Sequence, residues 1–267
     1  MVFLPVGKAH QRLIREQKAV QPHYGLFPPE WEGVNTDISN AVVKPIRLGL
    51  AKKIVEEYEW LGCMPAVSLY HFGIFFDDVC AGVTVFSRDY IENLGRWDKY
   101  GFTGRMLLLS RGVCVHWAHP HAGSKLIMDS IRQLPKQYDV ITATVDFAAG
   151  EIGTIYQACN FIYVGSMRES NPNIYEPRQG TAYRFGVKLD GKLYGPRAIR
   201  NKVGTQKKRD VLSSFPNAEF APQHNKHRYF LFRGSRASKK NLRQAIHHLE
   251  KPYPKRAVGA GHEQVHD

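Results

Sequence analysis

The run from Gly150 to Gly165 carries the most specific chemical signal in this chain. It follows the segment 140–145, which is rich in β-branched residues, so the pattern predicts a strand, a short loop, a helix and a second strand. This order places Asp146 at a strand end and Tyr156 on the next helix. Open α/β sheets bind ligands at such junctions because side chains and free helix amides converge there. We therefore expect a site at this junction.

Tyr156 and Asp146 have side chains suited to group transfer. The Tyr156 phenol could donate a proton to a leaving group as a tetrahedral intermediate collapses. Asp146 could act as a base or orient an attacking amine, since a carboxylate that ends a buried strand is costly without a partner or a task. Two simpler roles stay open. Tyr156 could be packed with its hydroxyl satisfied by a neighbour, and Asp146 could cap the following helix.

A second candidate lies where a helix is expected to begin, from about Ala122 to Leu134. Small residues at a helix start let a phosphate approach, and the unsatisfied amides and the helix dipole hold its charge. The candidate cofactor-binding residues are His119, Ala122, Gly123, Ser124 and Arg111. Ser124 could instead cap the helix. Arg111 follows a strand, where it could hold a phosphate or Asp146, or lie on the surface.

Tyr58, Glu59 and Trp60 close an expected helix that begins near Leu50. Adjacent helical residues point about 100 degrees apart, so the three cannot all face one site. Glu59 is a candidate general base and Trp60 a candidate stacking partner for a nucleic-acid base. Core packing of the aromatic residues is the alternative.

Cys114, His116, His119 and His121 are four potential metal ligands within a short segment. Thiolate and imidazole groups bind iron or zinc, so the three histidines are weak candidates for a metal site. Because His119 and His121 flank a proline at a helix entry, contact with an anion or simple exposure is the alternative. The four cysteines show no paired Cys-x-x-Cys spacing, which argues against a disulfide framework.

Positive charge is concentrated late in the chain. The formal net charge is +13, and residues 192–256 alone hold 17 Lys and Arg against 3 Asp and Glu. Such a concentration favours a polyanionic partner through phosphate contacts and counterion release, although a basic face that serves only solubility is the alternative. Aromatic residues at 229–232 within this segment predict a strand packed on the body of the protein. The candidate phosphate contacts are Lys207, Lys208, Arg209, Lys239, Lys240 and Arg243.

The order of expected elements predicts an α/β fold. A strand near residues 42–48 and the helix to Trp60 precede a hairpin with its turn at Asp77 and Asp78. A surface loop is expected at 90–104. We divide the chain into an irregular extension at 1–40 with a short helix near residues 10–18, a catalytic domain at 41–191, a basic extension at 192–256 and a disordered tail at 257–267. No run of 18 apolar residues and no signal-peptide pattern occurs, so we expect a soluble cytoplasmic protein without membrane contact.

Several of these segments resemble the Mom family of phage DNA-modification proteins, which have a GNAT-like acetyltransferase fold. The resemblance covers roughly residues 45–190, and the segment from Gly153 to Gly165 is its only part that is specific by itself. It implies a mixed sheet flanked by helices, with Tyr156 on the helix that faces the thioester sulfur in GNAT enzymes. The GNAT pyrophosphate pattern is only partly matched, since His119, Ala122 and Ser124 stand at its key positions. The other matching segments are 57–62, 109–112, 122–124 and Asp146.

The resemblance also implies a reaction on DNA in the host cytoplasm. Mom-like proteins add a carbamoylmethyl group to the exocyclic amine of adenine, which hides phage DNA from restriction enzymes. The donor could be acetyl-CoA, an aminoacyl-tRNA or another acyl compound, and iron is an open requirement. Two other classes remain: a conventional N-acetyltransferase that uses acetyl-CoA on a protein or small amine, and a non-catalytic nucleic-acid-binding protein. The oligomeric state does not follow from the sequence.

Overall fold

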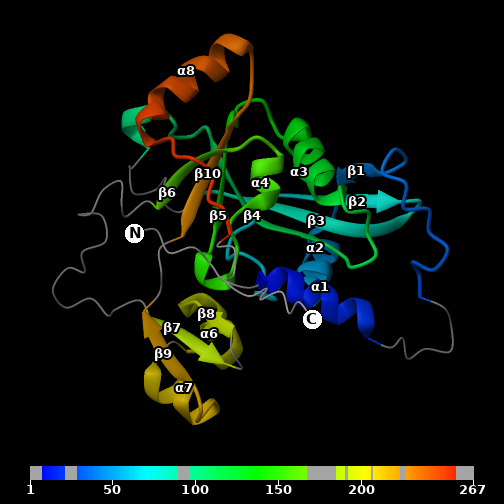
Figure 1. Cartoon of the computed structure of the whole chain (residues 1–267), viewed down its shortest axis with the longest axis vertical. Helices are drawn as coiled ribbons and strands as arrows, with labels where there is room; N and C mark the ends of the chain where they lie inside the picture. Colours follow the sequence, from blue (N-terminus) through cyan, green and yellow to red (C-terminus); the bar gives the residue numbers. More distant parts are fainter. Residues whose placement is uncertain are drawn as a thin grey trace, which may run out of the picture.

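The protein was analysed as a computed structural model of the whole chain (Figure 1). The structure describes residues 8–21, 29–89, 97–166, 185–189, 192–205, 207–222 and 226–256. The tail expected at 257–267 lies outside these ranges, as do parts of the expected N-terminal extension and surface loop.

A mixed seven-stranded sheet forms the body of the protein, as the sequence predicted. The strand order is β1-β2-β3-β4-β5-β10-β6. The β4–β5 pair is parallel and the other neighbours are antiparallel. The strands are β1 (Val42–Pro45), β2 (Tyr70–Phe76), β3 (Val79–Ser87), β4 (Met106–Cys114), β5 (Val140–Val145), β6 (Ile162–Ser166) and β10 (His227–Phe232).

Helices cover both faces of this sheet (Figure 1). Thr84 of β3 meets Ser130 of α3 (Ala122–Gln133) through a buried hydrogen bond of 2.9 Å. The side chains of Val83 and Val85 point the other way, as alternation along a strand requires, and pack in one core with α2 (Leu48–Tyr58). The short helix α4 (Thr154–Ala158) lies beside α3, and the predicted N-terminal helix is present as α1 (His10–Val20) beside α2.

The chain departs from the expected domain division after β6. Residues 185–222 form a small three-stranded sheet in the order β8-β7-β9, made of β7 (Phe185–Leu189), β8 (Lys192–Tyr194) and β9 (Glu219–Pro222). Two helices, α6 (Pro196–Val203) and α7 (Lys208–Ser214), pack with it around Val187, Ile199 and Val211. We call residues 185–222 the basic insert.

The chain then returns to the main sheet as β10, which pairs with both β5 and β6. The strand predicted at 229–232 is therefore confirmed. Its place is internal, however, so the expected basic extension at 192–256 is divided between the basic insert and the body. The basic insert at 185–222 therefore has other boundaries than the extension expected at 192–256. The reason is that β10 pairs with strands more than 60 residues earlier, and local sequence patterns do not reveal such a pairing.

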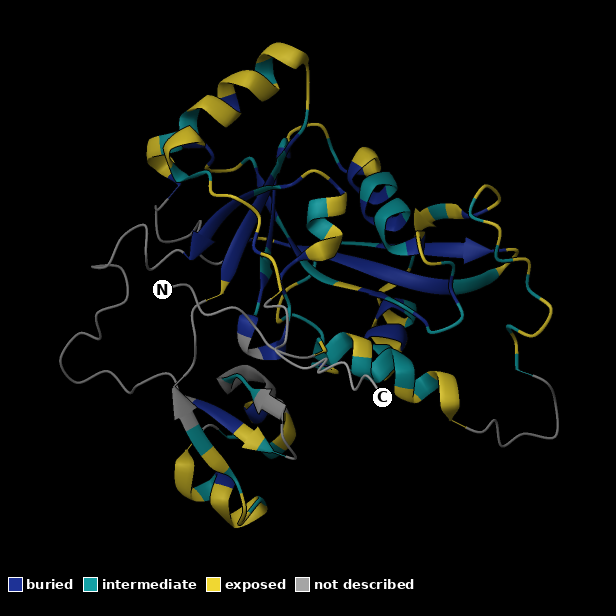
Figure 2. Cartoon of the chain, viewed as in Figure 1, coloured by how far each residue is buried: buried dark blue, intermediate teal, exposed yellow. Residues whose placement is uncertain are grey.

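Part of the expected surface loop is buried. Trp97 and Phe102 are almost fully buried and pack against Phe230 of β10 and against α8 (Arg236–Ile246). The sequence around these two rings is polar, but the rings are buried because removing apolar surface from water is favourable. Figure 2 shows the sheet strands as mostly buried, whereas α7 and α8 are largely exposed.

None of the helices in the described ranges is both long enough and apolar enough to cross a membrane.

Candidate active site

The junction after β5 is built around two glycines in the left-handed region. Gly150 has φ +71° and Gly153 has φ +76°, conformations that residues with a side chain rarely adopt. Between β5 and α4, the carbonyl of Asp146 accepts hydrogen bonds from the amides of Ala149 at 3.0 Å and Glu151 at 3.2 Å. The backbone of Asp146 thus closes the turn, and α4 begins directly after Gly153.

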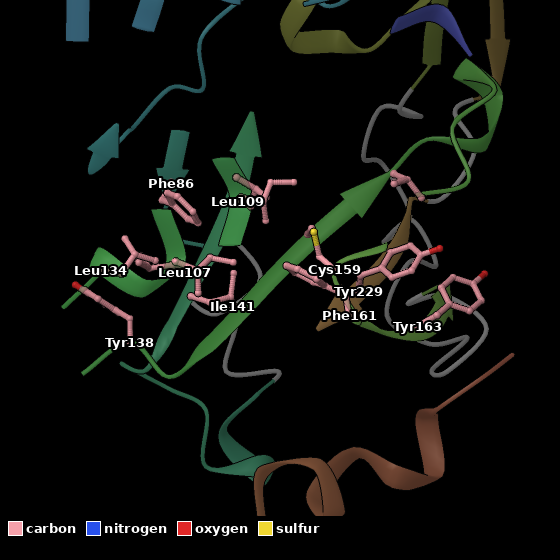
Figure 3. Close-up of a cluster of buried hydrophobic side chains, with 14 of the residues drawn as sticks. Phe86, Leu107, Leu109, Leu134, Tyr138, Ile141, Cys159, Phe161, Tyr163 and Tyr229 are labelled. Carbon is pink, nitrogen blue, oxygen red and sulfur yellow. The ribbon is translucent and has the colours of Figure 1, made fainter. Parts of the chain in front are cut away.

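Tyr156 lies on α4, as predicted, and is partly buried. Its ring packs against Phe161 and Tyr229, with centroid distances of 5.4 and 5.5 Å. Figure 3 shows Phe161 and Tyr229 in the core that supports this edge of the sheet. Burial, reinforced by the nearby Glu151 and Glu59, raises the pKa of Tyr156 above its ordinary value. The phenol is therefore protonated at neutral pH and suited to donate a proton.

Glu59 follows the end of α2 and forms an ion pair with Arg111 of β4. The helix ends at Tyr58, one residue before Glu59, whose backbone is extended. The Glu59 carboxylate lies 3.8 Å from Nε of Arg111, and the two side chains are only 9% and 12% exposed. Burial raises the pKa of Glu59, and the charge of Arg111 opposes this shift. Glu59 and Arg111 therefore form an ion pair that is largely shielded from solvent.

Arg111 is engaged by the segment that follows Glu59. Its Nε donates to the carbonyl of Cys63 at 2.6 Å, and its Nη1 donates to the carbonyl of Ser110 at 2.6 Å. These contacts connect β4 to the end of α2. The observed partners of Arg111 are Glu59, Cys63 and Ser110. The contacts of Arg111 with a phosphate or with Asp146, which the sequence suggested, stay predictions.

Glu151 is a site residue that sequence reasoning missed. Burial, with Glu59 as the next cause, raises the pKa of Glu151 to about 7. Lys226 and the Trp60 indole act to lower this pKa, and the charge of Asp146 acts to raise it. The available signal was a carboxylate between two glycines at a strand–helix junction, but Glu59 and Lys226, which shift its pKa, come from distant parts of the chain.

Trp60 is buried rather than presented to a partner. Only 8% of the residue is exposed, and its ring meets the His10 ring of α1 edge-on at a centroid distance of 5.2 Å. The core-packing alternative therefore describes this structure. A role in stacking on a nucleic-acid base would require Trp60 to leave these contacts.

The start of α3 lies next to α4. A side chain at Gly123 would contact Ile155 of α4, and the Cys159 thiol donates to the carbonyl of Ser124 at 3.9 Å. Ser124 is not the helix cap, because His121 occupies that position and the Ser124 hydroxyl donates to its carbonyl at 3.0 Å. Ala122 is fully buried. The fold thus brings the candidate phosphate-binding helix start beside the helix of Tyr156.

The candidate metal ligands do not converge. His116 packs between Trp31 and Tyr58, while Nδ1 of His119 accepts a hydrogen bond from the amide of His121 at 3.1 Å. Within the described ranges, no three His, Cys, Asp or Glu side chains are grouped to hold a metal ion. The arrangement of the described residues considered for iron or zinc therefore does not fit such a centre.

The predicted phosphate contacts fall into two separate groups (Figure 1). Strand β8 of the basic insert contacts the turn Phe147–Ala149 that follows β5, so this strand lies near Asp146. Lys207, Lys208 and Arg209 are exposed at the start of α7, on the side of the basic insert that lies away from the main sheet (Figure 1). Helix α8 follows the opposite end of β10 and carries exposed Lys239 and Lys240, while Arg243 forms two 2.8 Å hydrogen bonds with Glu250.

The fold is a mixed seven-stranded sheet with helices on both faces, which confirms the expected α/β architecture. The chain belongs to the Mom protein family, whose sequence profile matches residues 40–255. A search of the curated proteins gives no match.

Among solved structures, the chain is similar to an acetyltransferase from Bacillus subtilis in complex with CoA (12% identity, TM-score 0.37, 73% of this chain and 99% of that one). It is also similar to a GNAT family acetyltransferase from Elizabethkingia anophelis with acetyl-CoA bound (11%, 0.36, 73% and 99%). A third is a spermidine N-acetyltransferase from Vibrio cholerae (10%, 0.37, 73% and 94%). This likeness concerns the fold alone.

Proposed function

We propose that the protein is a Mom-like DNA-modification enzyme. It transfers a small acyl-derived group, of carbamoylmethyl type, to the exocyclic amine of adenine in DNA and so protects phage DNA from restriction. Membership of the Mom family supports the reaction. The observation that carries it furthest in this chain is the place of Tyr156 on α4, directly after the glycine turn that Asp146 closes and beside the start of α3.

The chemistry of adenine explains why such a group of residues is needed. The lone pair of the exocyclic amine is delocalised into the ring, so the amine is a poor nucleophile. Acceleration requires a base for its proton, a proton donor for the leaving group, and a donor molecule held in position. Tyr156 is the proton donor in this proposal. Asp146, at the end of β5, orients the attacking amine.

In duplex DNA the target amine is paired inside the helix. The enzyme would therefore flip the adenine into its pocket, at a cost of a few kcal/mol for unstacking. Strand β8 of the basic insert contacts the turn after Asp146, and the exposed cations of the insert on α7 bind phosphates of the DNA on either side of the target base in this proposal. The acyl donor is an activated ester or thioester, such as an aminoacyl-tRNA or acetyl-CoA, with its phosphates at the start of α3.

The test is to express the wild-type protein in a bacterium and to digest the total DNA to nucleosides for mass spectrometry. We expect a new adenosine species whose mass identifies the adduct. Tyr156→Phe is the matched variant, since Phe keeps the ring contacts and removes only the hydroxyl. It should abolish the adduct and leave DNA affinity nearly unchanged. Unmodified DNA from folded wild-type protein, with a phage-infected culture as the source of donor, would contradict the proposal.

A conventional N-acetyltransferase is the second candidate. The position of the α3 start beside α4 favours it, because a CoA pyrophosphate at that helix start would direct its thioester toward Tyr156. Calorimetry with acetyl-CoA separates the two. Tight binding without any DNA adduct would favour the second candidate. DNA binding that is unaffected by Tyr156→Phe, without adduct or acetyl-CoA binding, would indicate a non-catalytic binding protein.

A further inference from the structure

After α8 the chain returns to the candidate site as a segment without helix or strand. We call residues 250–256 the C-terminal strap, which is the red segment that follows α8 in Figure 1. The amide of Lys251 donates to the carbonyl of Tyr163 at 2.8 Å, and the Tyr253 hydroxyl donates to the carbonyl of Phe161 at 2.6 Å. These two bonds fasten the strap to β6 and to the residue before it.

The strap continues to α4 and to the turn that precedes this helix. The carbonyl of Pro254, a buried residue, accepts a hydrogen bond from Nε2 of Gln157 on α4 at 3.3 Å. Nη2 of Arg256 donates to the carbonyl of Gly150 at 2.9 Å, in the turn between β5 and α4. The strap thus contacts both the helix of Tyr156 and the turn from which this helix starts.

Two glycines of the segment 150–165 make room for distant parts of the chain. A Cβ at Gly165 would lie 2.8 Å from Cδ of Lys251 in the strap. A Cβ at Gly150 would lie 3.0 Å from Cα of Ala9, the residue before α1. The segment that precedes α1 and the strap that follows α8 therefore meet at the same turn.

Helix α4 depends on such contacts because it is short. It has five residues, Thr154–Ala158, and so short a helix gains too few backbone hydrogen bonds to offset the cost of its nucleation. The preceding turn contains glycines with positive φ, whose backbone has more freedom than that of other residues. The place of Tyr156 is therefore set by what holds this turn and the helix, and the bond from Arg256 to Gly150 restricts the turn.

We propose that Arg256 is a positioning residue of the transfer reaction. It acts through the carbonyl of Gly150 on the turn that joins Asp146 to the helix of Tyr156, while Tyr253 fastens the strap to the sheet. This role rests on the proposed function. A guanidinium suits the task because its N–H donors lie in a fixed plane and keep their charge at every relevant pH. A hydrogen bond from such a charged donor is also stronger than one between neutral groups.

The first experiment measures adduct formation by nucleoside mass spectrometry in the phage-infected culture that supplies the donor. Arg256→Ala should lower the adduct about 10-fold to 100-fold, because a displacement of about 1 Å at a reacting group costs up to about 100-fold. Arg256→Lys should restore most of the adduct, since lysine keeps a charged N–H donor. Lys255→Ala is the control, because it removes the same charge from the neighbouring exposed residue and should give the wild-type level.

Equal adduct from Arg256→Ala and Lys255→Ala, whether at or below the wild-type level, would overturn the positioning role of Arg256. Absence of adduct from the wild type would overturn the proposed function itself. In that case the contact of Arg256 with the turn is still decided by the second experiment, which needs no activity.

The second experiment follows amide hydrogen exchange by mass spectrometry in peptides that cover residues 147–158. We expect these peptides to exchange at least about 10-fold faster in Arg256→Ala, the factor that corresponds to the loss of one hydrogen bond from a charged donor. Tyr253→Phe, which removes only the hydroxyl that fastens the strap, should accelerate the same peptides by less. A peptide from β2 should be unchanged in both variants. Unchanged exchange at 147–158, or an equal increase in every peptide, would overturn the proposal.

Discussion

Gln11 holds the backbone of Trp60. The side-chain carbonyl of Gln11 accepts a hydrogen bond from the Trp60 amide at 3.1 Å, and its NH₂ group donates to the carbonyl of Tyr58 at 2.7 Å. The two bonds hold the residues on either side of Glu59, at the point where α2 ends and the backbone becomes extended. Arg15, one turn further along α1, donates to the carbonyls of His116 and Ala118 ahead of α3. The N-terminal helix, whose role the sequence left open, therefore fixes two of the segments that border the site.

Replacing Gln11 tests this relationship. Gln11→Ala removes both bonds and leaves the Trp60 amide and the Tyr58 carbonyl unpaired, so we expect a loss of about 1–2 kcal/mol of stability. The adduct level should fall further than this loss explains, because Glu59 and Trp60 lose their fixed position. Urea unfolding and nucleoside analysis measure the two effects. Gln17→Ala, at an exposed position on the same helix, is the control and should change neither. Equal adduct from Gln11→Ala and the control would contradict the idea.

A side chain at Gly153 should be far more damaging than one at Gly104. Both glycines have φ +76°, so alanine is strained by a similar amount, roughly 1–2 kcal/mol, at either position. At Gly153 the new Cβ would also lie 2.6 Å from the Tyr229 ring, whereas at Gly104 nothing lies within 4 Å. We expect Gly153→Ala to lower the unfolding midpoint more than Gly104→Ala and to remove the adduct, since α4 must shift. Equal unfolding midpoints for the two variants would show that the Tyr229 ring moves aside without a cost in stability.

Stability should depend on pH through Glu151. Its pKa is about 7 in the folded protein against an ordinary 4.5, so between these values the folded state keeps a proton that the unfolded chain has lost. The stabilising contribution is complete below about 4.5 and is lost as the pH rises through 7. Glu151→Gln should therefore flatten the decline in the urea midpoint between pH 5 and pH 8. The same decline in both proteins would assign the pH dependence to other groups.

The two basic groups should contribute unequally to DNA binding. The α7 group belongs to the basic insert, whose strand β8 contacts the turn after Asp146, and the α8 group follows the end of β10 that lies away from that turn. Combined replacement of Lys207, Lys208 and Arg209 by alanine should reduce the slope of log affinity against log salt by roughly 2–3, at about 0.9 for each phosphate contact. Combined replacement of Lys239 and Lys240 should leave the slope unchanged. A larger effect from the α8 pair would place the DNA on the other side of the sheet.

Local sequence patterns were sufficient for much of the fold. The hairpin turn at Asp77 and Asp78, the strand before Asp146 and the helix that carries Tyr156 were all predicted, because periodicity and glycine positions act over a few residues. The specific segment from Gly153 to Gly165 was also enough to suggest the Mom family, which the profile match then showed.

Tertiary structure decided what surrounds these elements. The place of β10 between β5 and β6, the burial of Trp60 and the contact of Arg111 with Glu59 all join segments far apart in the chain. Glu151 illustrates the difference most clearly. Its position after a strand was visible in the sequence, but its pKa depends on burial and on a second carboxylate from α2, which only the folded chain brings to it. Side-chain type is encoded locally, whereas the electrostatic environment that gives a carboxylate its chemistry is a property of the assembled sheet edge.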